Sequence, residues 1–122
     1  MKTSDKFTEI TSYQEEKFTE LFGEVDFVSK TTQLSSTKLG KYMNNKEIID
    51  ELKPTEVTLG EVYSCLETLD HSISALFYCR DKNDELNMVS ATWKEGWIVR
   101  TFIFEVDSEW RWRGDNYLFS KL

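Results

Sequence analysis

The hydrophobic pattern of this chain changes its period once, close to residue 71. Between residues 59 and 69 the apolar side chains recur every three or four positions, which is the spacing of one face of an α-helix. After residue 71 the pattern alternates, and β-branched and aromatic residues become frequent, as in strands. A switch of this kind predicts helices followed by a sheet, which is the α+β class. The alternating runs are Ser72–Cys79, Leu86–Trp93 and Trp97–Val106.

The first half of the chain predicts three helices. The opening segment, residues 4–23, has apolar residues near one helical face, and a capping-box pattern at Ser12 provides a competing start inside it. A short helix is expected over residues 46–53, because Pro54 prevents its continuation. The third helix, about residues 59–70, carries the clearest periodicity and follows its own capping-box pattern.

The second half predicts an antiparallel meander. Polar turns at Arg80–Glu85 and Lys94–Gly96 separate the three runs, and a fourth short strand is expected at Tyr117–Ser120. The predicted fold is therefore α+β, with N-terminal helices packed on a C-terminal antiparallel β-meander of three to four strands. The whole chain, residues 1–122, is expected to form one domain, helical over about 1–70 and sheet over about 72–120.

The stretch Ser29–Lys46 stands apart in composition. It holds four lysines and no acidic residue, and serine and threonine are frequent in it. Long polar segments between periodic ones are usually connections, so this stretch is predicted to be a solvated loop.

The hairpin pairing assigns side chains to the two faces of the sheet. Trp93 is expected opposite Trp97 across the three-residue turn, and Cys79 is expected opposite Leu86. Both faces then carry many apolar side chains, which leaves two alternatives: helices cover both sides, or one face stays exposed for a partner. The further pairs predicted are Ala91 with Val99 and Val89 with Thr101.

Charge and cysteine content limit the possible binding partners and the cellular compartment. The net charge of −7 disfavours direct binding to double-stranded DNA and to anionic membranes, since both require a basic face. Two cysteines are too few for a disulfide framework, and no apolar run resembles a signal peptide or a membrane span. A cytoplasmic location is therefore expected.

No catalytic, metal or cofactor site is predicted from the sequence. His71 is the only histidine and has no recognisable nucleophile motif near it, so it is interpreted as a connector between helix and strand. Alternating carboxylates at Glu105, Asp107 and Glu109 are interpreted as the charged end of a strand. The sequence therefore favours a binding function over an enzymatic one.

All four tryptophans and all four arginines follow residue 71. Tryptophan and arginine are enriched at interaction hot spots, so the first hypothesis is a non-catalytic module that binds a macromolecular partner, most simply a protein, through an aromatic and arginine patch. The alternative is that these rings belong to the core, where aromatic residues dominate small domains. The proposed partner-binding residues are Tyr78, Trp93, Trp97, Trp110, Arg111 and Trp112.

Two further hypotheses stay open. The segment Asp5–Asp26 holds seven acidic residues against two lysines, so an acidic helix there could mimic nucleic acid and inhibit a basic nucleic-acid-binding protein. The other is a small-ligand pocket or enzyme of a small α+β fold, in which helices and a curved sheet enclose an apolar cavity.

Overall fold

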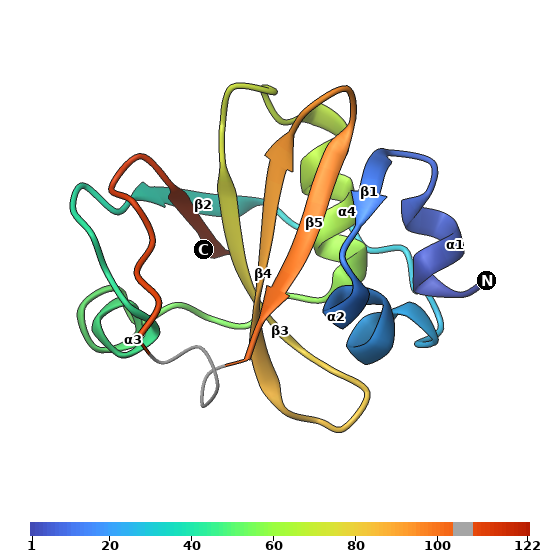
Figure 1. The fold of residues 1–122 in the computed structure, drawn as a ribbon, viewed down its shortest axis with the longest axis horizontal. Coiled ribbons are helices and arrows are strands. Elements are labelled where there is room, and N and C mark those ends of the chain that lie inside the picture. The colour runs from blue at the N-terminus through green and yellow to red at the C-terminus, as the bar shows by residue number, and fades with distance from the viewer. Residues whose placement is uncertain (104–108) are drawn as a thin grey trace.

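The computed structural model describes residues 1–103 and 109–122, and its centre is one six-stranded sheet (Figure 1). The strands are β1 (Thr11–Gln14), β2 (Leu34–Lys38), β3 (Ala75–Arg80), β4 (Leu86–Trp93), β5 (Trp97–Phe102) and β6 (Tyr117–Lys121). Their order across the sheet is β1-β5-β4-β3-β6-β2. The pairs β1–β5 and β3–β6 are parallel, and the other neighbours are antiparallel.

The helices are short. They are α1 (Thr3–Phe7), α2 (Glu16–Phe18), the π-helix η1 (Thr19–Gly23), α3 (Asn45–Leu52) and α4 (Leu59–Thr68). Within the two described ranges, none of them has the length and apolar character needed to span a bilayer.

The mixed six-stranded sheet shows that the predicted antiparallel meander of three to four strands was wrong. Strands β3, β4 and β5 do form successive antiparallel hairpins. The fourth predicted strand, β6, pairs in parallel with β3, and the first half of the chain supplies both edge strands, β1 and β2. These edge strands are short and mostly polar, so they lack the alternating apolar pattern by which the other strands are recognised.

The opening segment forms a helix only in part. Strand β1 interrupts it, because the Trp97 N–H donates to the Ile10 carbonyl and the Glu15 N–H donates to the Val99 carbonyl, which tie this stretch to β5. Ser12 therefore lies in a strand and caps no helix. Three phenylalanines of this segment are nevertheless buried: Phe7 in α1, Phe18 at the end of α2 and Phe22 in η1.

The stretch Ser29–Lys46, predicted to be a loop, contains β2 and an isolated bridge from Met43 to Trp112. Both depend on partners more than sixty residues away in the sequence, because β2 pairs with β6. Such non-local pairing leaves no local signal.

Helices α3 and α4 begin and end close to their predicted positions. Both have complete capping boxes, in which the side chain of the residue before the helix and the glutamate three positions later each bond the other's backbone N–H. The α4 box, at Thr58 and Glu61, is the predicted one, and the α3 box at Asn44 and Glu47 was not predicted.

The register of the first hairpin differs by one residue from the prediction. Cys79 pairs with Asn87, and Leu86 pairs with Arg80. Asp81 causes the shift, because its carboxylate accepts the N–H groups of the turn and the side-chain amide of Asn87 at 2.6 Å. The second hairpin has the predicted pairs, Trp93 with Trp97, Ala91 with Val99 and Val89 with Thr101. The predicted continuation of β5 to Val106 lies outside the described residues.

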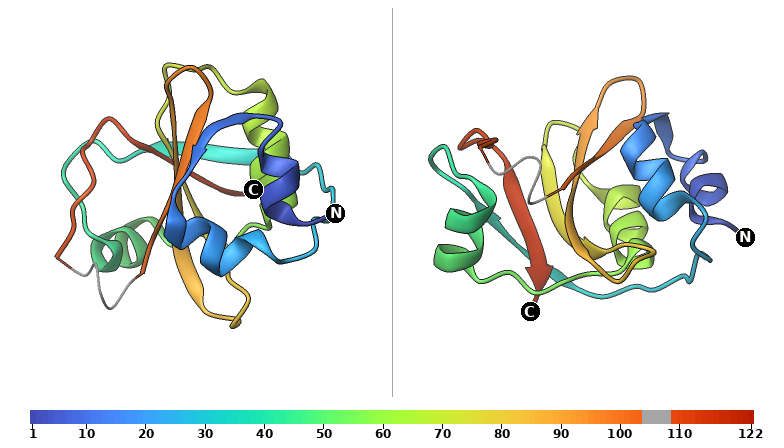
Figure 2. Two further views of the ribbon diagram at one scale, coloured as in Figure 1. Left: turned by 45° about the vertical axis from the view of Figure 1, so that its right-hand side comes forward. Right: turned by 60° about the horizontal axis from the view of Figure 1, so that its bottom comes forward.

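A shift of one residue exchanges the two faces of a strand. Phe77 and Cys79 consequently share a face with Val89 and Trp97, and Tyr78 lies on the opposite face. Helices α1, α2 and α4 pack on the first face, and α3 packs on the second (Figure 2). Of the two alternatives left by the sequence, the structure shows apolar packing on both sides of the sheet.

Candidate functional site

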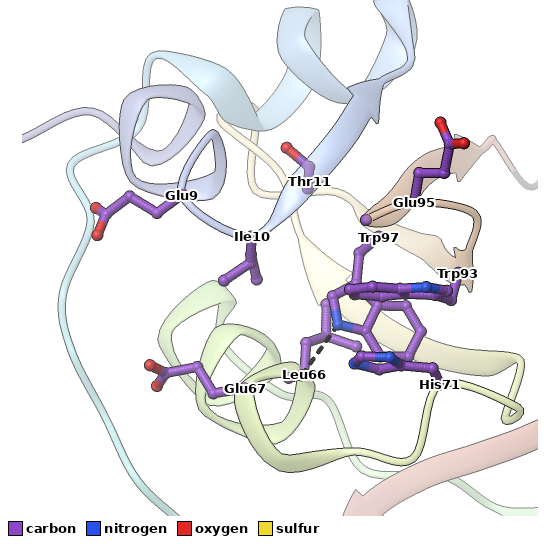
Figure 3. Close-up of a pocket in the computed structure, with 10 residues that line it drawn as sticks. Glu9, Ile10, Thr11, Leu66, Glu67, His71, Trp93, Glu95 and Trp97 are labelled. Atoms are coloured by element: carbon purple, nitrogen blue, oxygen red, sulfur yellow. Dashed lines mark hydrogen bonds between the residues drawn. The ribbon is translucent and has the colours of Figure 1, made fainter.

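A pocket of about 330 Å³ opens where three segments meet: the end of α1 with the start of β1, the end of α4, and the β4–β5 turn (Figure 3). Aromatic rings form one side of it, and the aliphatic side chains of Ile10, in the link between α1 and β1, and of Leu66, in α4, form the rest of its apolar lining. The lining residues that matter here are Glu9, Ile10, Leu66, Glu67, Glu95 and Trp97, together with Trp93 and His71.

Trp93 and His71 form a parallel stack at the mouth of the pocket. Their ring centroids lie 3.4 Å apart with an angle of 7° between the planes, and Trp97 stands perpendicular to both rings. Trp97 is 1% exposed, whereas Trp93 is 39% exposed and His71 is also exposed. The pair therefore presents aromatic surface to solvent over a buried third ring.

The buried ring is held by the end of α4. Leu66 lies in the last turn of the helix, where carbonyl groups have no intrahelical partner. The Trp97 indole N–H donates to the Leu66 carbonyl at 3.0 Å. This one hydrogen bond satisfies both the buried indole donor and a carbonyl group at the end of α4. This bond joins the sheet to α4 directly below the stack.

The β4–β5 turn is packed against β1. Glu95 and Gly96 have positive φ angles of 59° and 144°, and a Cβ on Gly96 would lie 2.7 Å from the backbone nitrogen of Ser12. The Ser12 hydroxyl donates to the Lys94 carbonyl at 2.9 Å. Close packing at this glycine thus fixes the turn that carries both tryptophans and Glu95.

The turn that carries His71 is fixed by its neighbours. The backbone N–H and hydroxyl of Ser72 donate to the Asp70 carboxylate at 2.8 and 2.6 Å. These bonds, first that of the hydroxyl and then that of the backbone, lower the pKa of Asp70 from its ordinary value, and His71 adds to the effect through its charge. The ordered turn positions the imidazole over Trp93.

The charged residues that line the pocket are acidic. Glu9, Glu67 and Glu95 lie around its rim with their carboxylates turned outward (Figure 3), and the described lining residues include no lysine or arginine. Glu9 is paired with Lys6 at 3.4 Å. Within residues 1–103 and 109–122, Glu67 and Glu95 form no ion pair, so two carboxylates remain available to a ligand.

Two other hollows have features less suited to a ligand. One, of about 330 Å³, contains Cys65, whose pKa is raised to about 11 by burial, so its thiol is a poor nucleophile. The other, of about 270 Å³, contains Arg80, which is already paired with Glu56 at 2.8 Å. In the described part of the chain no three histidine, cysteine or acidic side chains are arranged to hold a metal ion.

The structure distributes the six predicted partner-binding residues over both faces of the sheet. Trp93 and Trp97 lie at the pocket, on the α4 side. Tyr78 is buried on the α3 side and donates to Asn45 at 2.9 Å, and Trp112 is buried beside it. The other two are exposed, Trp110 stacked on Phe102 and Arg111 paired with Glu47 at 3.5 Å.

Sequence reasoning missed the residues that surround Trp93. His71 was interpreted as a connector, and Glu67 and Glu95 were not singled out. Their side chains come from α4, the following turn and the β4–β5 turn, so only the packing of α4 on the hairpin brings them together. The predicted Trp93–Trp97 pairing was the one local signal that pointed to this place.

Comparisons with models of protein families, with curated proteins and with solved structures give no match to this chain. The function is therefore inferred from the residues of the chain itself.

Proposed function

We propose that the protein is a non-catalytic interaction module that docks a basic segment of a partner protein at the Trp93–His71 pocket. The observation that carries this proposal is the exposed parallel stack of these two rings beside two carboxylates without ion-pair partners in the described ranges. A tryptophan face and nearby carboxylates together suit a cationic side chain.

Exposure of Trp93 supports a contact surface at this position. An indole ring is a large apolar group, and tryptophan is the residue type most enriched at interaction hot spots. Trp93 keeps 39% of its surface exposed although it contacts both His71 and Trp97. A partner that covered the ring would therefore remove apolar surface from water without disturbing the core.

Electrostatics support a basic partner. The chain carries a net charge of −7, and the charged lining residues are glutamates. Opposite charge on a partner accelerates association and adds specificity, and salt weakens both effects.

The lining residues support binding over catalysis. Among the described residues that line the pocket, Thr11 alone has a hydroxyl, and this hydroxyl donates to the Phe7 carbonyl at 2.7 Å. It is therefore engaged in the backbone of α1 and is not activated by His71. We also propose a cytoplasmic location, which the free thiols of Cys65 and Cys79 support.

The hypothesis of an acidic inhibitor also invokes a basic partner but uses other residues. The acidic residues between Asp5 and Asp26 are distributed over α1, α2, η1 and the segments that flank these elements, so no single acidic helix presents them. The hypothesis of a small-ligand site differs from the proposed docking site in that the ligand is a small molecule and not a protein segment. The experiment below distinguishes the acidic inhibitor and the small-ligand site from the proposed function.

The test is a titration of ¹⁵N-labelled protein with a short synthetic peptide that alternates arginine and lysine with glycine. We expect the indole N–H signal of Trp93 to shift and that of Trp110 to stay in place. Trp93→Leu should weaken binding about fivefold or more, because a cation over an indole contributes ~0.5–1 kcal/mol and apolar contact is lost as well. Trp110→Leu is the matched control, an exposed tryptophan with the same replacement.

Three results would contradict the proposal. Binding unaffected by Trp93→Leu but lost when the glutamates of residues 15–24 are neutralised would favour the acidic inhibitor. Equal binding of the peptide and of free guanidinium would favour a small-ligand site. Absence of any salt-sensitive binding would exclude a basic partner.

A further inference from the structure

We propose that the pocket selects arginine over lysine, with a guanidinium group continuing the stack of His71 and Trp93. This inference rests on the proposed function, because it names the side chain of the partner that the pocket receives. Three features of the site carry it: the orientation of the rings, the position of the free carboxylates and the shape of the apolar lining.

The ring stack leaves one face of Trp93 open. His71 covers one face in a nearly parallel orientation, and Trp97 contacts the indole at an angle of 86°. In the described ranges, these are the ring contacts of Trp93. Figure 3 shows the stack almost edge-on, with His71 on one side of the indole and Glu95 arising on the other. Glu95 therefore lies on the side of the open face, and its exposed carboxylate, which Figure 3 shows turned outward, would reach a stacked ligand by a rotation of the side chain.

A planar cation fits this face better than a compact one. Guanidinium is flat, weakly hydrated and able to stack on an aromatic ring while its N–H groups bond in the plane. The ammonium group of lysine is a strongly hydrated point charge, so it gains less from a flat surface and loses more water. The stack therefore discriminates by shape at equal charge.

The two carboxylates without ion pairs in the described ranges belong to exposed side chains of the pocket rim, which can rotate toward the edge of a guanidinium. Glu95 comes from the β4–β5 turn, and Glu67 comes from α4 across the pocket. The five N–H groups of a guanidinium can reach acceptors in more than one direction while its face stays on the indole. Pairing of Glu9 with Lys6 leaves Glu67 and Glu95 as the groups that would receive them.

The aliphatic part of the pocket accommodates the arginine stem. Ile10 and Leu66 line the cavity between the acidic rim and Trp97, and its volume of about 330 Å³ exceeds the needs of one unbranched side chain. Long charged side chains commonly bury their methylene groups on apolar surface in this way.

The experiment compares three short peptides that differ only at one central residue: arginine, lysine or citrulline. Citrulline keeps the flat shape of arginine without its charge, so the series separates stacking from charge. Affinities are measured from the shifts of the backbone amide signals of Glu95 and Gly96, which all variants retain, and in the unchanged protein also from the Trp93 indole N–H signal. We expect arginine to bind at least about fivefold more tightly than lysine, and more tightly than citrulline.

Variants at the site assign the selectivity to its cause. Trp93→Leu should bring the affinity for arginine down to that for lysine, and Trp93→Tyr should leave an intermediate preference because its ring is smaller. Glu95→Gln should weaken the arginine and lysine peptides and leave the citrulline peptide unchanged. Trp110→Leu should change none of the three affinities, and far-ultraviolet circular dichroism checks that each variant is folded.

The outcomes separate this inference from the proposed function. Equal affinity for arginine and lysine at the Trp93 signal would overturn the selectivity and leave a basic docking site in place. Arginine preference that persists in Trp93→Leu would overturn the stacking explanation. Failure of all three peptides, together with failure of the longer basic peptide, would overturn the proposed function itself.

Discussion

Two aromatic groups in this molecule have a similar composition and different surroundings. At the hairpin end, the exposed Trp93 stacks on His71 above the buried Trp97. On the opposite side of the sheet, Trp110 is 52% exposed and stacks on Phe102, whose ring is perpendicular to the buried Trp112. Each group therefore has one tryptophan in the core and one at the surface.

The difference lies in what borders the exposed ring. Trp93 lines a pocket with two available carboxylates, whereas Trp110 lies on Phe102 and its neighbour Arg111 is paired with Glu47. Burial of tryptophan thus contributes stability in both groups. Only the group at the hairpin end combines exposed aromatic surface with a hollow and with opposite charge for a ligand.

The largest expected effect concerns the buried member of the first group. Trp97→Ala should lower the free energy of unfolding by about 3–5 kcal/mol, because it empties core volume and removes the donor that satisfies the Leu66 carbonyl. Urea unfolding measures the loss, and Trp97→Phe provides a milder variant if the alanine protein does not fold. A loss of stability no greater than that of Trp93→Ala would show that the buried Trp97 contributes no more to the core than the exposed Trp93.

A smaller effect is expected on the α3 side, at Tyr78. Its buried hydroxyl donates to Asn45, so Tyr78→Phe should cost about 1–3 kcal/mol by leaving a buried acceptor without that bond. Tyr42→Phe is the control, since Tyr42 is exposed. Unchanged stability in Tyr78→Phe, measured by the same urea unfolding, would mean that the polar pair does not hold this side of the core together.

A pH effect is expected from Glu61, on the α4 side. Burial of this carboxyl opposes its ionisation, but the Thr32 hydroxyl, the Thr58 backbone and the charge of Lys121 outweigh burial and lower its pKa from the ordinary value of 4.5. Its contribution to stability is therefore present above about pH 4.5 and is lost as the pH falls through the lower folded-state value.

Glu61→Gln should accordingly flatten the fall in stability on acidification. The pH-dependent part of the difference in free energy of unfolding between the two proteins, followed from neutral pH down to acid, should begin to shrink near pH 4.5 and disappear below the lower folded-state pKa of Glu61. Glu67→Gln, which removes an exposed carboxylate from the same helix, serves as the control. If the difference between Glu61→Gln and the unchanged protein does not vary with pH, the ionised carboxylate is not what stabilises α4.

The smallest expected effects concern the two exposed rings. Trp93→Phe and Trp110→Phe should each lower the free energy of unfolding by only about 0.5–1.5 kcal/mol, because a phenyl ring keeps part of the stack and of the buried area of each half-exposed indole. Urea unfolding of both variants measures this directly. A much larger loss for either ring would place it with the core and would argue against a role in binding.

Much of the local structure could be predicted because it depends on neighbouring residues. Helix α4 follows from its capping box and periodicity, α3 from the stop that Pro54 imposes, and β4 with the Trp93–Trp97 hairpin from alternation and turn length. The register of β3 with β4 could not be predicted, because it depends on which groups the Asp81 side chain bonds in the turn. Strands β1 and β2 were missed because short polar strands form only when a partner strand is present.

The candidate site was predicted only at Trp93 and Trp97, which both line the pocket. The sequence singled out these tryptophans by residue type and by their position at a hairpin. His71, Glu67 and Glu95 could not be assigned to it, because an exposed histidine or glutamate has no distinguishing pattern of its own. The sequence also could not separate Trp97, which the structure buries, from the exposed Trp93.

The sequence by itself determined the α+β character of this protein, the helices that flank Pro54, the pairing of the second hairpin and the acidic charge. Each of these follows from residues close together in the chain or from composition alone. Tertiary structure alone decided the mixed sheet, the exchange of faces in β3 and the pocket beside Trp93. The physical reason is that the pairing of strands and the exposure of a ring depend on which distant segments pack on one another. The packing that forms is the one that minimises the free energy of the whole chain, not that of any single segment.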